Sequence, residues 1–174
     1  METATAKTYN MAMALIGELT HEAKTTRTIL ERVPAEKFEY TPHEKSMKMG
    51  RLAVHVAEMI NWVTVTCTTP ELDFSTMDMT PFAPKSNDDL LAYFDKNVAE
   101  AFESLKKTSD ESMMETWTMR NGDQVFMAES RIVTLRGMVF NHIWHHRGQL
   151  SVYLRLNDMP VPSIYGPSAD EGQM

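Results

Sequence analysis

The chain has 174 residues, of which 43% are hydrophobic and 24% charged, and its net charge is −7. This balance is typical of a folded globular protein, and the length fits one domain, which we expect to span residues 1–174. Binding to nucleic acid or to an anionic membrane needs clustered Lys and Arg, but the densest basic stretch is the pair Lys106–Lys107. We therefore expect a small-molecule ligand or a protein partner, and neither nucleic acid nor a membrane.

The cysteine count and the hydropathy pattern predict a cytoplasmic protein. Cys67 is the only cysteine, so no intrachain disulfide can form, in keeping with a reducing compartment. The apolar stretch at residues 11–16 is soon interrupted by Glu18 and lacks the basic flank and long apolar core of a secretion signal. No stretch approaches the ~20 apolar residues that a membrane-spanning helix needs.

Two long amphipathic helices are predicted in the first half of the chain. The first covers residues 6–32, where one apolar stripe recurs at steps of three and four: Met11, Ala14, Leu15, Leu19, Ala23, Leu30 and Val33. Pro34 and Pro42 interrupt the connector that follows. The second helix begins near Ser46 and continues to Pro70, with a buried face of Leu52, Val56, Met59, Ile60 and Val63.

A polar loop is expected over residues 69–85, with Phe74 and Phe82 as its anchors. The sequence SNDD that begins at Ser86 supplies capping side chains for a third helix, which ends at Lys107. Between residues 115 and 127 short β-favouring runs flank Asn121-Gly122, a dipeptide that favours tight turns. A small β-hairpin is therefore expected before the last helix.

The fourth helix is predicted over residues 129–156, and the sequence from Asn157 to Pro160 ends it. Its inward residues are expected to be Ile132, Leu135, Met138, Val139, Leu150, Tyr153 and Leu154. The irregular tail that follows can dock through Val161, Ile164 and Tyr165. Four long amphipathic helices in one domain predict an all-α four-helix bundle.

Three of the six histidines fall within five residues, in the run NHIWHHRGQL at residues 141–150. His142 and His146 lie one helical turn apart, so their imidazoles can reach one metal ion. His142 and His145 can do the same, because both pairs fall on partly apolar seams of the helix. Helical periodicity leaves the choice between His145 and His146 open.

A tight metal site needs a third ligand from another element, and His55 is the best candidate. It lies in the second helix between Val54 and Val56, where a buried imidazole needs a polar partner. The competing interpretation is a core histidine satisfied by hydrogen bonds, which is the commoner outcome for a single histidine on an apolar face. The spacing of the residues does not decide between the two.

Several neighbours of these histidines have candidate supporting roles. Gln149 lies one turn after the adjacent histidine pair and can hydrogen-bond a ligand ring. Glu58 lies one turn after His55 and is a candidate base, but a solvated surface carboxylate is the more ordinary interpretation. Arg147 can orient an anionic substrate, but on a bundle helix it is expected to extend into solvent. Three aromatic residues can line a pocket or simply pack: Trp144, Tyr153 and Tyr165.

Two other chemistries find little support in the sequence. Glu18 and His21 have the Glu-x-x-His spacing of di-iron bundles, but that chemistry needs a second such pair and two more inward carboxylates, so we reject it. His43 lies in a polar connector and is expected on the surface. Cys67 has no electropositive neighbour in the sequence and is expected to be a packing residue.

The run NHIWHHRGQLSVYLRLNDMPVPSIYGPSADE resembles the last helix and tail of DinB/YfiT-like proteins, the damage-inducible bundle family rather than the polymerase of that name. VPAEKFEYTPHEKSMKMGRLAVHVAEM resembles their first connector and second helix. The resemblance implies an up-down-down-up four-helix bundle, often a homodimer, with a divalent metal held by His55, His142 and His146. His145 is then not a ligand. Members of the family often bind nickel or zinc, and characterised relatives include transferases and isomerases that use low-molecular-weight thiols.

The expected function is therefore that of a divalent-metal-dependent transferase or hydrolase acting on a small molecule. A site of three imidazoles leaves a coordination position open and preserves the full +2 charge, which suits activation of a low-molecular-weight thiol or of water. The alternative is a non-catalytic protein, in which the metal holds the bundle together or the histidine cluster stays empty and the bundle serves as an interaction module.

Overall fold

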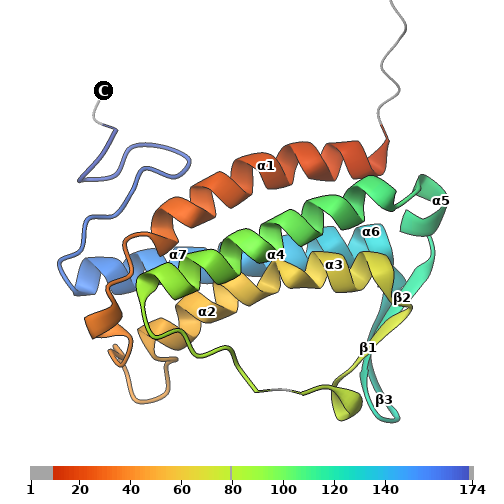
Figure 1. Ribbon diagram of the computed structural model, residues 1–174, viewed down its shortest axis with the longest axis horizontal. Helices are drawn as coiled ribbons and strands as arrows, with labels where there is room; N and C mark the ends of the chain where they lie inside the picture. The colour runs from red at the N-terminus through yellow and green to blue at the C-terminus, as the bar shows by residue number, and fades with distance from the viewer. Residues whose placement is uncertain (1–9, 79, 173–174) are drawn as a thin grey trace, which may run out of the picture.

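The computed structural model describes residues 10–78 and 80–172, and its long helices run beside one another (Figure 1). These are α1 (Met11–Leu30), α4 (Asn87–Lys107), α7 (Asn141–Leu156) and the consecutive pair α2 (Met49–Met59) and α3 (Asn61–Thr68). α4 packs against α1, α2 and α3, whereas α7 packs against α1 and α2. A mostly helical protein is thus confirmed, and the up-down-down-up order remains a prediction. No helix in the described residues is long and apolar enough to cross a membrane.

The ends of the long helices follow from local capping. The side chain of Asn10 accepts a hydrogen bond from the backbone N–H of Met13 and caps the start of α1. The predicted start of this helix, at residue 6, lies outside the described residues. Ser86 and Asp89 form a reciprocal capping box at the start of α4, and α4 ends at Lys107 as predicted. Short helical turns occur at η1 (Ala35–Lys37), η2 (Phe74–Thr76) and α5 (Asp110–Met113).

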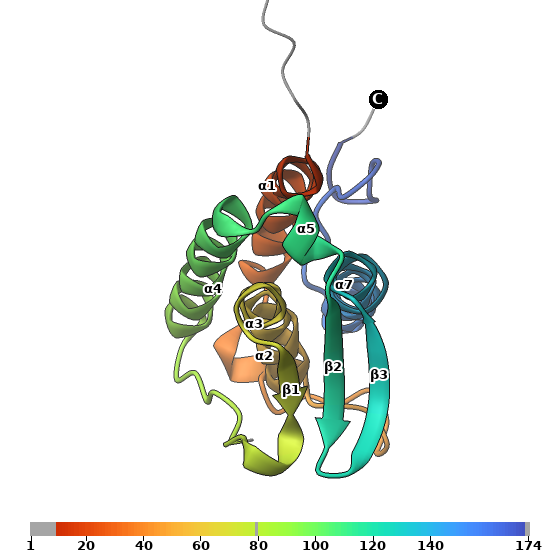
Figure 2. The same cartoon turned by 90° about the vertical axis from the view of Figure 1, so that its right-hand side faces the viewer.

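A three-stranded sheet lies at one end of the helices, so the all-α prediction is incomplete (Figure 2). The predicted hairpin is present as β2 (Thr116–Asn121) and β3 (Gln124–Ser130), and Gly122 adopts a φ of 56° in its turn. The third strand, β1 (Glu71–Asp73), pairs in parallel with β2 inside the segment that was expected to be a loop. Its three residues are too few to show a strand periodicity.

The second helix differs from the single continuous helix that was predicted. It begins at Met49 rather than near Ser46, and it breaks at Ile60 into α2 and α3. The buried side chain of Asn97 on α4 donates a hydrogen bond of 3.0 Å to the carbonyl of Ala57, in the last turn before the break. A backbone acceptor near the break therefore has a partner on another helix.

The last predicted helix is also interrupted. It begins at α6 (Arg131–Val133) rather than at residue 129, and a π-helix (Thr134–Phe140) separates α6 from α7. Residue 129 belongs to β3. A π-helix has more residues per turn than an α-helix, so it changes the angle at which side chains leave the helix on either side. This segment directly precedes the histidine run of α7.

The C-terminal tail docks on the bundle through a buried ion pair. Arg147 on α7 is only 2% exposed, which contradicts the expectation that it extends into solvent. Its guanidinium donates to Glu22 of α1 at 2.6 Å and to the hydroxyl of Tyr165 in the tail at 2.5 Å. The Tyr165 hydroxyl lies 2.9 Å from the Glu22 carboxylate, so three distant segments meet at one charged cluster. Val161 and Ile164, two other residues of the tail, are half-buried and pack against the core, as expected.

Candidate metal centre

Three histidines from two helices meet with their Nε2 atoms facing one another. His55 comes from α2, and His142 and His146 come from successive turns of α7. The Nε2 atoms of His55 and His142 are 3.3 Å apart, and those of His142 and His146 are 2.7 Å apart. All three ligand atoms lie within 4.8 Å of one another. The structure thus brings together the residues that the sequence singled out.

The spacing of these nitrogens suits a single divalent cation. With metal–nitrogen bonds of ~2.0–2.1 Å, two imidazole nitrogens on one ion stand about 2.9 Å apart in octahedral geometry and about 3.3 Å apart in tetrahedral geometry. The separation of 3.3 Å between His55 and His142 equals the second value, and the 2.7 Å between His142 and His146 is close to the first. The donor set, three imidazoles, is one that zinc and nickel accept.

The ring of His55 is fixed by a carboxylate on its own helix. Its Nδ1 lies 2.7 Å from Oε1 of Glu58, one turn later, and Arg51 donates to the same oxygen at 2.8 Å. Burial raises the pKa of Glu58, but the hydrogen bonds from His55 and Arg51 outweigh it, and the pKa lies below its ordinary value. An ionised carboxylate only accepts, so the hydrogen-bond network places the proton of His55 on Nδ1 and leaves the Nε2 lone pair for a metal.

Glu58 therefore differs from the solvated carboxylate that the sequence suggested. Its side chain is 21% exposed and bonded on both sides. The pairing with Arg51 spans two helical turns, a spacing at which side chains share a face. The seven-residue spacing of Arg51 and Glu58 in RLAVHVAE could have predicted this ion pair. Arg51 was not included in the site predicted from the sequence.

His146 is oriented in the same way by an amide. Its Nδ1 lies 2.7 Å from Oε1 of Gln149, so the amide oxygen accepts from Nδ1 and the Nε2 lone pair again faces the cluster. The Gln149 amide nitrogen in turn lies 3.1 Å from Nε2 of the exposed His145. The hydrogen bond from Gln149 to a histidine ring that the sequence predicts is thus present. Of the two histidines that periodicity left open, His146 lies in the cluster and His145 lies outside it.

The local electrostatics keep His142 and His146 neutral at physiological pH. Burial, and then the positive charge that His146 and His55 would carry, lower the pKa of His142 to about 4. Burial also lowers the pKa of His146. A neutral imidazole is the form that binds a metal, so these rings need no proton release before a cation arrives at pH 7.

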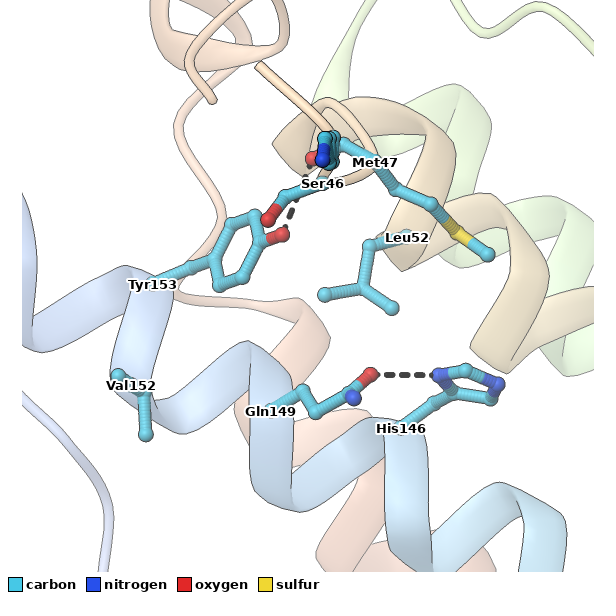
Figure 3. Close-up of a pocket in the computed structure, with 8 residues that line it drawn as sticks. Ser46, Met47, Leu52, His146, Gln149, Val152 and Tyr153 are labelled. Carbon is cyan, nitrogen blue, oxygen red and sulfur yellow. Dashed lines mark hydrogen bonds between the residues drawn. The ribbon is translucent and has the colours of Figure 1, made fainter. Parts of the chain in front are cut away.

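A cavity of about 410 Å³ adjoins the cluster on the side of His146 (Figure 3). Figure 3 shows Ser46 and Met47 of the connector at one end, His146 and Gln149 of α7 at the other, and Leu52 between them. The Tyr153 hydroxyl donates to the carbonyl of Met47 at 3.0 Å and ties the connector to α7. This volume is in the range of small-molecule sites.

The other residues considered from the sequence lie apart from the cluster. His21 and His43 are exposed, and Glu18 pairs with Arg136 on the π-helix. Cys67 is half-buried, and burial raises the pKa of its thiol, which fits a packing residue. Of the three aromatic residues, Tyr153 lines the cavity beside His146, while the other two, Trp144 and Tyr165, line a separate hollow of about 220 Å³ near the tail.

Comparisons with known proteins agree with this architecture. The DinB family model matches residues 4–173. An uncharacterized Bacillus subtilis (strain 168) protein, YrdA, is 24% identical over 157 residues, which cover 86% of this chain and 85% of that protein. The crystal structure of a DinB-like protein from Bacillus cereus ATCC 10987 has a TM-score of 0.64 at 21% identity, covering 86% of this chain and 94% of that one. For the DinB-like protein YjoA from Bacillus subtilis the TM-score is 0.67 at 16% identity, with 86% and 95% covered.

Proposed function

Because this chain belongs to the DinB family, we propose that it is a divalent-metal-dependent transferase or hydrolase acting on a small molecule, with His55, His142 and His146 as metal ligands. The observation that carries the proposal is the convergence of three imidazole nitrogens within 4.8 Å of one another. Zinc or nickel is the proposed ion, since both accept neutral nitrogen ligands.

The chemistry of the site follows from the donor set. Three neutral ligands leave the full charge of a divalent ion in place, and such an ion lowers the pKa of a low-molecular-weight thiol or of water and polarises a carbonyl. The protein's own groups prepare the site for it. Glu58 and Gln149 hold the Nδ1 protons of His55 and His146, so that both Nε2 lone pairs remain available.

The cavity beside His146 favours an enzyme over the alternative, a bundle in which the metal is purely structural. Structural zinc sites are enclosed by four protein ligands, whereas this cluster offers three and borders a space of about 410 Å³. Met47 and Leu52 line that space with apolar atoms, which would remove water from a small substrate as it enters.

Metal analysis of protein purified without a histidine tag tests the proposal. The wild-type chain should carry close to one zinc or nickel ion, and His55→Ala and His146→Ala should lose it. His145→Ala is the matched control, because this exposed neighbour lies outside the cluster and its removal should leave the metal content unchanged. Full metal content in His55→Ala would remove α2 from the site and contradict the proposal.

The nucleophile can be identified with the same preparations. A panel of low-molecular-weight thiols, incubated with small electrophiles, should show turnover with the wild-type protein and not with His55→Ala. Hydrolysis without any thiol would identify water as the nucleophile. A stoichiometric metal ion that exchanges no solvent ligand, measured by water-proton relaxation of the nickel form, would instead support the structural alternative.

The homodimer implied by the resemblance is part of the proposal for the protein in solution. Light scattering coupled to size-exclusion chromatography should return twice the mass of one chain. A mass equal to that of one chain at micromolar concentration would overturn this element and leave the metal site untouched.

A further inference from the structure

The cavity beside His146 has two chemically distinct parts. Its walls are mainly apolar, formed by Met47, Leu52, Val152 and the ring of Tyr153. Its polar groups fall at two ends, with His146 and Gln149 at the α7 end and Ser46 at the connector end (Figure 3). A ligand that fills this space therefore needs an apolar body between two polar ends.

The charge that lines the connector end of the cavity is positive. Lys45 lines the cavity next to Ser46, and none of the eight described lining residues carries a carboxylate. Among the described ion pairs, Lys45 has no acidic partner, whereas Lys48 on the same connector is paired with Glu39. The ammonium group of Lys45 is thus available to a ligand in a way that the Lys48 ammonium is not.

We propose that this cavity binds a small organic carboxylate with an apolar body, whose carboxylate lies against Lys45 and whose opposite end reaches His146. The proposal rests on the proposed function, because it names the substrate class for the same site. The carboxylate fixes one end of the substrate at the connector, and the apolar walls direct the rest of it toward the histidine cluster.

A carboxylate fits this end better than a phosphate. Phosphate sites are commonly built from several backbone N–H groups at a helix N-terminus or from Arg side chains that donate in pairs. The connector end offers one ammonium and the hydroxyl of Ser46, in a cavity whose remaining walls are apolar. One positive charge matches the single negative charge of a monocarboxylate.

Binding of a matched pair of probes to the full chain tests this proposal. The probes are 4-phenylbutanoate and 4-phenylbutanamide, which share an apolar body and differ in the charge at one end. Titration calorimetry should show the carboxylate binding about threefold to fivefold tighter than the amide, the factor that ~0.6–1 kcal/mol for one exposed charge pair gives. In ¹⁵N-labelled protein, the shifted amide signals should lie in residues 45–52 and 146–153.

Charge variants separate Lys45 from the general charge of the surface. Lys45→Gln should abolish the preference for the carboxylate, and Lys45→Glu should reverse it. Lys48→Gln is the control and should keep the preference, because Glu39 already neutralises Lys48. Equal affinity of the wild-type protein for the two probes, or a preference that survives in Lys45→Gln, would overturn the proposal.

Titrations with and without added zinc distinguish this proposal from the proposed function. A carboxylate preference that depends on Lys45 in the metal-free protein supports the cavity assignment, even if metal analysis shows no bound ion. A preference that appears only with zinc and ignores Lys45 would place the carboxylate at the histidines and refute the assignment. Metal content in Lys45→Gln should equal that of the wild type.

Discussion

The Nδ1 atom of His55 lies 2.7 Å from a carboxylate oxygen of Glu58, one turn later on the same helix. This contact fixes the ring so that Nε2 points at His142, 3.3 Å away. A carboxylate behind a metal-binding imidazole both orients the ring and raises its basicity. The hydrogen bond is therefore expected to affect metal affinity, although Glu58 belongs to the surroundings of the cluster.

Replacing Glu58 should weaken metal binding without removing a ligand. Glu58→Ala is expected to lower zinc affinity by about 10–100-fold, and Glu58→Gln by less, because the amide oxygen still accepts from Nδ1. Competition with a chromophoric chelator measures the affinity. Glu103→Ala, on an exposed face of α4, is the control. Wild-type affinity in Glu58→Ala would show that the contact has no influence on the ion.

The side chain of Asn97 should be important for stability, because it is buried and donates to Ala57 next to the break between α2 and α3. Asn97→Leu leaves that carbonyl without its partner, and we expect a loss of about 1–3 kcal/mol in the free energy of unfolding. Urea denaturation measures the loss, with Lys96→Ala, an exposed change on the same helix, as the control. A midpoint equal to that of the control would argue against a structural role for this contact.

Gly50 should tolerate no larger residue, because Phe38 of the connector packs directly on it. A Cβ at Gly50 would lie 2.8 Å from the Phe38 Cβ and 3.2 Å from its Cα. Gly50→Ala should therefore cost about 1–3 kcal/mol of the free energy of unfolding, measured by thermal or urea denaturation.

Gly148 on α7 provides the opposite case for the same substitution. No heavy atom lies within 4 Å of a Cβ built there, so Gly148→Ala should stabilise the helix by about 0.5–1 kcal/mol. A similar effect of the two substitutions, in either direction, would refute the packing argument at Gly50. The double variant Gly50→Ala with Phe38→Ala should recover part of the loss specific to the close contact.

The reactivity of Cys67 should show a clear pH dependence. Burial raises the pKa of its thiol above the ordinary value of 9.0, so at any pH near 8 the folded protein holds less thiolate than the unfolded chain. The contribution of the neutral thiol to folding stability is fully present below the thiol pKa of the unfolded chain. It is lost as the pH rises through the thiol pKa of the folded protein.

Alkylation by iodoacetamide measures this effect. The half-maximal rate in the folded protein should lie above pH 9, and the rate at pH 8 should be well below that of the protein unfolded in urea. Equal rates for the folded and unfolded protein at pH 8 would show that the thiol is more accessible and more acidic than its surroundings imply.

Much of the architecture could be predicted from local patterns. The apolar stripes identified the long helices, Ser86 marked the start of α4, and the Asn121-Gly122 pair located the hairpin. These features depend on residues close together in the sequence. The three histidines were also singled out: His142 by helical spacing, His55 by its apolar surroundings on the second helix, and His146, rather than His145, by the resemblance.

The features that were missed depend on partners far away in the chain. No Pro or Gly in the sequence predicts the break at Ile60. The partner of the Ala57 carbonyl beside it, Asn97, is on α4. Arg131 is buried because its guanidinium donates to the carbonyls of Thr66 and Thr69 at the end of α3, 62 and more residues earlier. The burial of Arg147 likewise requires Glu22, 125 residues away. Helical periodicity on one segment contains no information about such partners.

The pairing of α1 with α7 through Glu22 and Arg147 has a consequence for synthesis on the ribosome. The two residues are 125 positions apart, and His55 is 87 positions from His142, so neither contact can form until α7 has emerged. During translation the apolar faces of the first helices therefore stay exposed until α7 is available to pack on them. Chaperones can bind these faces in that interval. Acquisition of a metal ion at the proposed site would then come only after α7 has packed against α2.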